Sequence, residues 1–211
     1  MRLEVILSCV ASVRLEVLAD IGTDHAFIPI EAVKRKLVSK AIACDIASGP
    51  LEVGKKNVVR EGLTGYIDFR LGDGLQPLKP GEADTIVIAG IGGMRIHAII
   101  AGSLDKICNA NLILQPQHDT CKLRRGLFDL GLKIYGEHLA KESDRFYEIL
   151  CAAKSFDMPK LTERDFFLGS HTGELAPLFY LQQKQKIEKY IHRISDENEK
   201  ERAHKELAWL S

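Results

Sequence analysis

The sequence contains no apolar run long enough to cross a membrane. A transmembrane helix needs about 20 consecutive apolar residues, and no segment of the 211-residue chain comes near that length. The first residues, MRLEVILSCVASVRLEV, have an apolar middle, but they carry Glu4 and lack a small-residue cleavage site. They therefore predict a folded helix and not a signal peptide. We expect a cytoplasmic protein with no membrane partner.

The chain also lacks closely spaced cysteines and an excess of charge of one sign. Its five cysteines are scattered, and none forms a C-x-x-C pair, so we expect buried free thiols and no metal site. Its 29 basic and 29 acidic residues leave no net charge at pH 7. Strong binding to nucleic-acid phosphates needs clustered Lys and Arg. Composition therefore gives no support for RNA binding, although a basic face can be balanced by acids elsewhere.

Short apolar runs alternate with helix-length stretches from about residue 15 to residue 153. The predicted strands are 16–21, 40–46, 66–71, 83–91 and 110–116, and the helices between them are 27–37, 50–63, 93–104 and 121–131. Two adjacent strands, 133–142 and 145–154, then follow without a helix between them. This order predicts an α/β fold of Rossmann-like type, with a mostly parallel twisted sheet, helices on both faces and an antiparallel end.

After Lys154 the pattern changes. The segment SFDMPKLTERD interrupts it, and residues 175–210 are polar with apolar residues at helical spacing. The stretch SDEN (195–198) fits a turn or a cap between two helices. We therefore predict an α/β domain over 1–154 and a small helical hairpin domain over 155–211. The apolar stripe of the tail either packs internally or pairs two chains, and a monomer is the favoured expectation.

Glycines and acids follow each of the first four predicted strands. The four stretches are Asp20-Ile21-Gly22-Thr23-Asp24-His25, Asp45, Gly72-Asp73-Gly74 and Ala89-Gly90-Ile91-Gly92-Gly93. Singly, each has an ordinary structural interpretation as a turn, a helix cap or a solvated strand end. Ligands of open α/β sheets, however, bind outside the carboxyl ends of the strands. The succession of all four stretches therefore favours one ligand pocket.

The acids indicate which ligand this pocket accepts. An acid that ends the second strand, such as Asp45, commonly accepts hydrogen bonds from ribose hydroxyls, and an acid such as Asp73 can accept from an adenine amino group. Asp24 lies where a dinucleotide would need bare backbone for its pyrophosphate, and its charge would repel that group. S-adenosylmethionine carries a sulfonium and an ammonium in place of phosphate. The acids therefore favour this cationic adenosine cofactor.

Five stretches, LADIGTDHAFIP, GPLEVGKKNV, RLGDGL, EADTIVIAGIGGM and LILQPQ, together resemble the bacterial tRNA (adenine-N1)-methyltransferases that modify adenine 22 in the D-arm. The resemblance covers about residues 15–153 and extends more loosely to the tail. It implies a class I methyltransferase domain and a C-terminal, coiled-coil-like domain that helps to hold tRNA. Phe27 stands where the family has tyrosine, and Ile91 where methionine is usual.

The resemblance also implies roles for the strand-end residues. It implies that the methionine part of the cofactor is surrounded by Asp20, Gly22, Thr23, Asp24 and His25. By the same resemblance, Asp45 holds the ribose, and Asp73 and Gly74 lie at the adenine. The residues implied near the transferred methyl group are Ala89, Gly90, Ile91 and Gly92.

Adenine N1 carries a lone pair and no proton, so its methylation needs alignment more than a general base. Asp24 and Gln115 are the candidates for a catalytic part, whereas Gln117 is more readily interpreted as a structural amide. The basic cluster Lys122, Arg124 and Arg125 is the best candidate for phosphate contact. Two alternatives stay open: a methyltransferase for another RNA or a small molecule, and a non-catalytic protein that binds an adenosine ligand or RNA.

Overall fold

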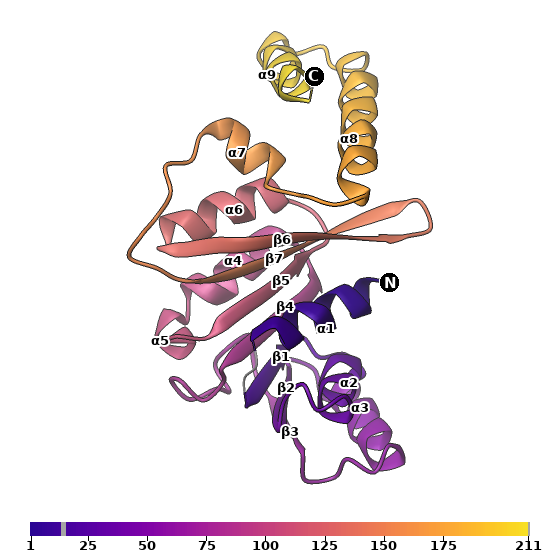
Figure 1. Cartoon of the computed structure of the whole chain (residues 1–211), viewed down its shortest axis with the longest axis vertical. Coiled ribbons are helices and arrows are strands. Elements are labelled where there is room, and N and C mark those ends of the chain that lie inside the picture. Colours follow the sequence, from indigo (N-terminus) through magenta and orange to yellow (C-terminus); the bar gives the residue numbers. More distant parts are fainter. Residues whose placement is uncertain (14–15, 211) are drawn as a thin grey trace.

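The computed structural model describes residues 1–13 and 16–210, which build a seven-stranded sheet in the order β3-β2-β1-β4-β5-β7-β6 (Figure 1). The strands are β1 (Val17–Ile21), β2 (Lys40–Asp45), β3 (Ile67–Leu71), β4 (Thr85–Ile91), β5 (Asn111–Pro116), β6 (Leu132–Glu142) and β7 (Arg145–Lys154). The first five run parallel, and β7 is antiparallel to both β5 and β6. The predicted α/β sheet with an antiparallel end is confirmed.

Helices cover both faces of this sheet. On one face lie α1 (Arg2–Val13), α2 (Phe27–Lys34) and α3 (Ser48–Arg60), and on the other α4 (Gly93–Ala101), α5 (Leu104–Ile107) and α6 (Thr120–Asp129). The central strand β4 sends Ile86 and Ile88 into one core and Val87 into the other. A strand buried on both faces has no polar side to present, and this explains its nearly continuous apolar sequence. The predicted N-terminal helix is present as α1.

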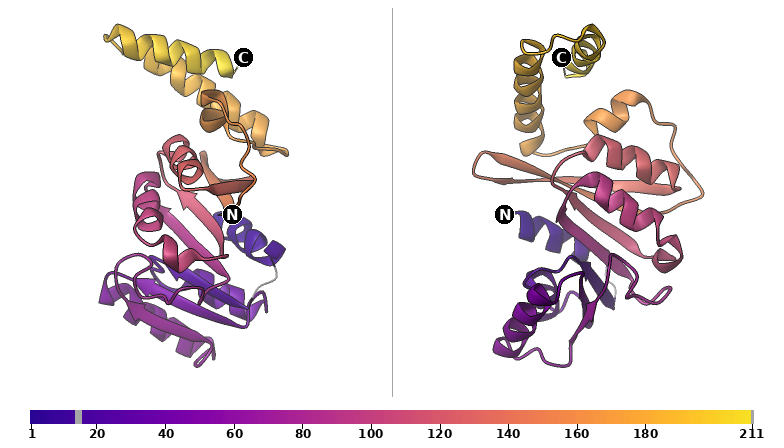
Figure 2. Two further views of the ribbon diagram at one scale, coloured as in Figure 1. Left: turned by 90° about the vertical axis from the view of Figure 1, so that its left-hand side faces the viewer. Right: turned by 180° about the vertical axis from the view of Figure 1, so that it is seen from behind.

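The C-terminal helices project away from the edge of the sheet that carries β6 and β7 (Figure 2). They are α7 (Glu163–Leu168), α8 (Leu175–Ile191) and α9 (Glu197–Trp209). The predicted helical pair is present as α8 and α9, and Asp196 caps α9 by accepting from the Glu199 N–H at 2.9 Å. Helix α7 was not predicted, although a capping box between Thr162 and Asp165 marks its start. None of the helices in the described ranges is long and apolar enough to span a bilayer.

Candidate functional site

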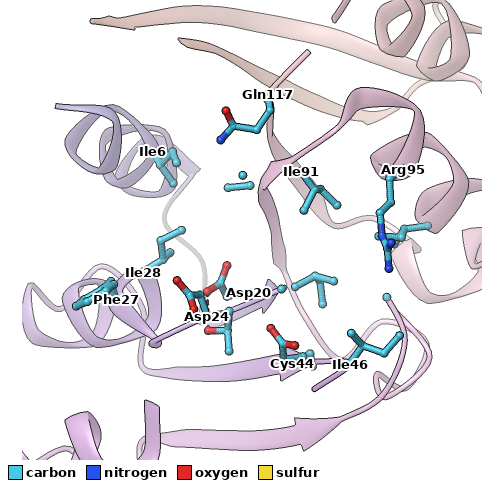
Figure 3. A pocket seen from close by; sticks show the side chains of 18 of the residues that line it. Ile6, Asp20, Asp24, Phe27, Ile28, Cys44, Ile46, Ile91, Arg95 and Gln117 are labelled. Carbon is cyan, nitrogen blue, oxygen red and sulfur yellow. Dashed lines mark hydrogen bonds between the residues drawn. The ribbon is translucent and has the colours of Figure 1, made fainter. Parts of the chain in front are cut away.

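The carboxyl ends of the first four strands surround a pocket of about 680 Å³, called here the strand-end pocket (Figure 3). Ten of the twelve residues predicted to hold a cofactor line it: Asp20, Gly22, Thr23, Asp24, Asp45, Asp73, Gly74, Ala89, Gly90 and Ile91. The other two, His25 and Gly92, do not. Parallel strands bring their ends to one edge of the sheet, so residues far apart in sequence converge there.

The loop between β1 and α2 turns sharply beneath this pocket. Gly22, Asp24 and Ala26 all have positive φ angles, of 74°, 46° and 60°. The N–H groups of Gly22 and Thr23 donate to the carbonyl oxygen of Cys44 at 2.9 and 3.0 Å, which ties the loop to β2. These two backbone donors are therefore bonded within the protein and are not free for a ligand. The side chain of Asp24 is 72% exposed and borders the pocket.

Asp20 is the buried acid of the site. Its residue is 3% exposed, and Oδ2 accepts a hydrogen bond from the Thr23 hydroxyl at 2.7 Å. Burial raises the pKa of Asp20 to about 7; the Thr23 bond opposes this rise, and the nearby charges of Asp45 and Asp24 add to it. Asp20 and Asp24 both line the pocket, and the charge of Asp24 disfavours ionisation of Asp20. A cation placed between them would relieve their mutual repulsion.

The ends of β2 and β3 form the opposite side of the pocket. Asp45 accepts the Ala47 N–H through Oδ1 at 2.9 Å, and its own carbonyl accepts the Gly72 N–H at 2.9 Å. A Cβ at Gly72 would lie 2.5 Å from the Pro77 ring. At Gly74, where φ is 54°, a Cβ would lie 2.9 Å from Ile99. Glycine at both positions therefore lets this turn pack closely beside the pocket.

The two predicted residues that do not line the pocket have other contacts. A Cβ at Gly92 would lie 2.6 Å from the His118 ring, so this glycine permits close packing of two neighbouring loops. His25 is 44% exposed, and its ring meets the Phe27 ring edge-on with centroids 5.6 Å apart. Neither residue lines the pocket, and their predicted roles beside the cofactor stay predictions.

Several pocket residues were missed by the sequence analysis. They are Arg2, Leu3 and Ile6 from α1, Phe27 and Ile28 from α2, Ile46 after β2, and Arg95 and Ile99 from α4. Helix α1 lies beside the carboxyl ends of the strands in Figures 1 and 3. Nothing in its local sequence indicates this position, because its placement depends on long-range packing. Arg95 follows Gly93 by two residues. Its nearness to the predicted strand-end stretch 89–93 is a sequence feature that indicates a place at the pocket.

The two glutamines near the end of β5 lie in different surroundings. Gln115 is fully buried: its Oε1 accepts from Arg2 at 3.2 Å and its Nε2 donates to the Pro116 carbonyl at 2.7 Å. Both ends of its amide are occupied and it does not line the pocket, so the structure gives no support to the catalytic part predicted for Gln115. Gln117 does line the pocket, and Arg145 donates to its Oε1 at 2.6 Å.

A second hollow of about 480 Å³, called here the helical cleft, lies between the start of α6 and the C-terminal helices. Gln117 lines both hollows, so they are adjacent. The basic side chains of the helical cleft include Lys122, Arg145, Lys186 and Arg202. The same cleft contains Asp119, Glu148 and Glu206, and Lys122 and Arg202 pair with Asp119 and Glu206. With Arg124 included, its Lys and Arg side chains outnumber these acids by five to three.

The predicted basic cluster is divided between the surface and the interior. Lys122 and Arg125 have side chains 65% and 42% exposed. Arg124, at 3%, is buried and bonds to Glu137 through Nε at 2.9 Å and to Glu148 through Nη2 at 2.5 Å. Burial lowers the pKa of the guanidinium, but these two carboxylates outweigh it and hold the pKa above its usual value. Arg124 is thus a structural cation: it borders the helical cleft, but its burial and its two carboxylate partners argue against the predicted contact with phosphate.

Comparisons with known proteins agree with this architecture. A family model described as tRNA (adenine(22)-N(1))-methyltransferase matches residues 18–211. The Bacillus subtilis tRNA (adenine(22)-N(1))-methyltransferase is 41% identical over 137 residues, a match that covers 64% of this chain and 58% of that protein. The solved B. subtilis m1A22 tRNA methyltransferase superimposes with a TM-score of 0.85 at 30% identity, covering 99% of this chain and 95% of that one.

Related structures contain ligands. A Streptococcus pneumoniae protein solved with S-adenosyl-L-methionine has a TM-score of 0.88 at 31% identity and covers 99% of this chain and 96% of its own. M. capricolum TrmK, solved with S-adenosyl-homocysteine, has a TM-score of 0.84 at 27% identity, covering 97% and 94%.

Proposed function

Since the chain belongs to the tRNA (adenine(22)-N(1))-methyltransferase family, we propose that it transfers the methyl group of S-adenosylmethionine to N1 of adenine 22 in tRNA. The observation that carries this proposal is the acid-rich strand-end pocket, in which the backbone donors of Gly22 and Thr23 are already bonded. Such a pocket suits a cationic adenosine ligand and disfavours a pyrophosphate. The proposed substrate also implies a cytoplasmic location.

We assign the parts of the cofactor to the acids that line the pocket. Asp20 and Asp24 face the ammonium and sulfonium charges, since both line the pocket at the first loop and their negative charges repel each other. Asp45 accepts from the ribose hydroxyls at the end of β2, and Asp73 accepts from the adenine amino group. The apolar side chains of Ile46 and Ile99 complete the adenine side.

The reaction depends mainly on alignment. Bound S-adenosylmethionine supplies an electrophilic methyl group on a sulfonium centre. Adenine N1 has an in-plane lone pair and no proton, so the chain needs no strong general base to activate it. Holding the reactants in line can contribute about 7–11 kcal/mol to lowering the barrier. Gly90, which has a φ of 81° at the bulge in β4, and Gln117 border the space left for the base.

The target base must leave its stack to expose N1, which lies on the Watson–Crick edge. We propose that the base enters beside Gln117 and that the backbone of the tRNA follows the helical cleft. Lys122, Arg145, Lys186 and Arg202 are the candidate phosphate contacts there. Their positive charges suit the nucleic-acid backbone.

Transfer of labelled methyl from S-adenosylmethionine to unmodified tRNA tests the proposal. The matched control is the same tRNA with guanine in place of adenine 22. Label in the first tRNA and not in the second is the expected result. Label in neither, with cofactor binding intact, would overturn the tRNA assignment and direct the search to other RNAs or small acceptors.

A further inference from the structure

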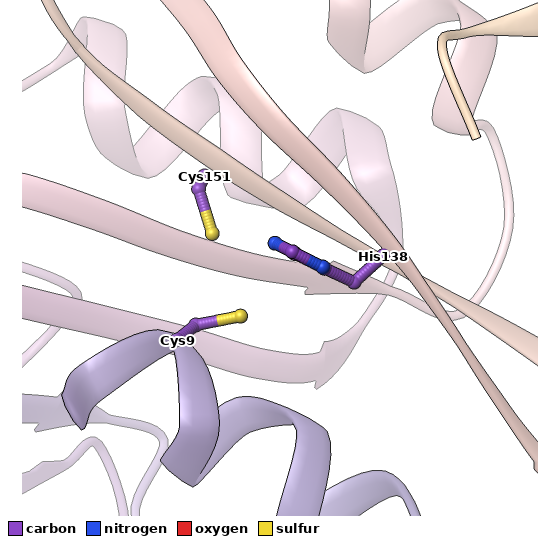
Figure 4. Close-up of side chains that lie close together, drawn as sticks. All are labelled: Cys9, His138 and Cys151. Atoms are coloured by element: carbon purple, nitrogen blue, oxygen red, sulfur yellow. The ribbon is translucent and has the colours of Figure 1, made fainter. Parts of the chain in front are cut away.

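Three potential metal ligands from distant parts of the sequence meet on the face of the sheet that α1 covers (Figure 4). Cys9 comes from α1, His138 from β6 and Cys151 from β7. Their donor atoms all lie within 4.8 Å of one another. The expectation of no metal site rested on the absence of closely spaced cysteines, but here the fold brings distant ligands together.

Gly136 makes room for this cluster. The strands β6 and β7 shift register between Ile134 and Gly136, and Gly136 then pairs with Cys151. Side chains two residues apart share a face of a strand, so His138 lies on the same face as Cys151. A Cβ at Gly136 would lie 3.3 Å from His138 Nε2 and 3.6 Å from Cys151 Cβ. The imidazole therefore occupies the space above the glycine, next to the thiol.

The surroundings suit a metal that prefers sulfur and nitrogen. Cys9 and Cys151 are only 4% and 3% exposed, whereas His138 lies at the surface. Zinc binds cysteine sulfur at about 2.3 Å in tetrahedral sites, so neighbouring sulfur ligands lie about 3.7 Å apart. A separation of up to 4.8 Å therefore needs only small side-chain adjustments. Thiolate and imidazole together select zinc over magnesium or calcium.

We propose that Cys9, His138 and Cys151 bind one zinc ion, with water as the fourth ligand. Binding displaces the two thiol protons to solvent, and the two thiolates then balance the charge of the ion. Helix α1, which carries Cys9, also contributes Arg2, Leu3 and Ile6 to the lining of the strand-end pocket. A bound ion thus fastens α1 to the β6-β7 hairpin and stabilises one wall of that pocket.

Cobalt(II) is the probe, because its spectrum reports both sulfur ligation and geometry. The purified full chain, reduced and stripped with a chelator, is titrated with cobalt and then with zinc. We expect one cobalt per chain, with sulfur-to-cobalt charge-transfer absorption and tetrahedral d–d bands that zinc abolishes. Cys151→Ser should lose most of the charge-transfer absorption. Cys108→Ser, which alters a thiol outside the cluster, should bind cobalt as the wild type does.

Two further variants separate metal binding from folding. His138→Asn alters an exposed residue and should melt like the metal-free wild type while losing the melting-temperature increase that zinc causes. Gly136→Ala should weaken zinc affinity by about tenfold or more, because it displaces the ring. Absence of a charge-transfer band in the reduced wild type would overturn the proposal. Equal cobalt spectra and affinity in His138→Asn and wild type would also overturn it.

Discussion

The hydroxyl of Thr23 donates a 2.7 Å hydrogen bond to Oδ2 of the buried Asp20. This bond favours the ionised form of the carboxyl group, but burial has the larger effect and raises the pKa of Asp20 to about 7. Asp20 therefore changes charge near neutral pH. It does so in the pocket that we propose for a cationic cofactor, so cofactor affinity should depend on pH.

Ionised Asp20 attracts the sulfonium and ammonium groups, so affinity for S-adenosylmethionine should rise with pH. If the bound cation keeps Asp20 ionised, the dissociation constant should be about tenfold smaller near pH 8 than near pH 6. Calorimetric titration across this range measures the effect. Asp20→Asn is the control, since it keeps the shape of the side chain and should bind more weakly with little of this pH dependence. Identical pH profiles for the two proteins would contradict the assignment.

The raised pKa of Asp20 also predicts a gain in stability on replacement. An acid whose folded pKa is about 7 and whose ordinary value is 3.8 contributes stability that is fully present below pH 3.8. That contribution is lost as the pH rises through 7. The cofactor-free Asp20→Asn variant should therefore exceed the wild type by roughly 1–3 kcal/mol in unfolding free energy near pH 8. Urea unfolding tests this expectation, and a less stable variant would show that ionised Asp20 does not oppose folding.

Arg124 and Arg125 should differ sharply in their importance for folding. Arg124→Ala would leave Glu137 and Glu148 buried without their cation, and we expect a loss of about 3–5 kcal/mol in unfolding free energy. Arg125 pairs with Glu163 at the surface, so Arg125→Ala should cost less than about 1 kcal/mol. Chemical denaturation of both variants measures the difference. Similar losses would mean that the buried network has no special role.

The difference in burial between these two arginines could not be predicted from the sequence. The sequence places both in one basic helix, and a basic run is usually a solvated face. Burial of Arg124 depends on Glu137 and Glu148, and on the Phe166 carbonyl that accepts from its Nη1 at 3.2 Å. These partners lie 13 to 42 residues away in sequence. No local pattern reports such an arrangement.

The candidate cofactor site was more predictable than the RNA surface. Its residues follow strands whose apolar runs are visible in the sequence, and parallel strand ends necessarily meet at one edge. Asp20, Asp24, Asp45 and Asp73 were found in this way and do line the pocket. Helix α1 could be predicted as a helix, but not as a wall of the pocket. Its position follows from packing against several distant elements.

Gly93 should be intolerant of even one added methyl group. It begins α4, its N–H donates to the His118 carbonyl at 2.9 Å, and a Cβ would lie 2.7 Å from the Asp119 carbonyl oxygen. Gly93→Ala should therefore lower unfolding free energy by about 1–3 kcal/mol. Gly49, in the first turn of α3, has open space around its Cβ position, so Gly49→Ala is the matched control. It should be neutral or stabilising, and a similar loss in both would contradict the packing argument.

Gln117 should matter for the acceptor and not for the cofactor, because it lines both the strand-end pocket and the helical cleft. Loss of one hydrogen bond corresponds to about a two- to tenfold effect, so we expect Gln117→Ala to lower kcat/KM for tRNA by that factor. Its dissociation constant for S-adenosylmethionine should stay near the wild-type value. Gln76→Ala is the control, since Gln76 is exposed and lines neither hollow. A cofactor affinity that falls together with kcat/KM would mean that Gln117 supports the cofactor and does not guide the base. Unchanged kinetics would remove Gln117 from the path of the base and leave the backbone around Gly90 as the surface that receives it.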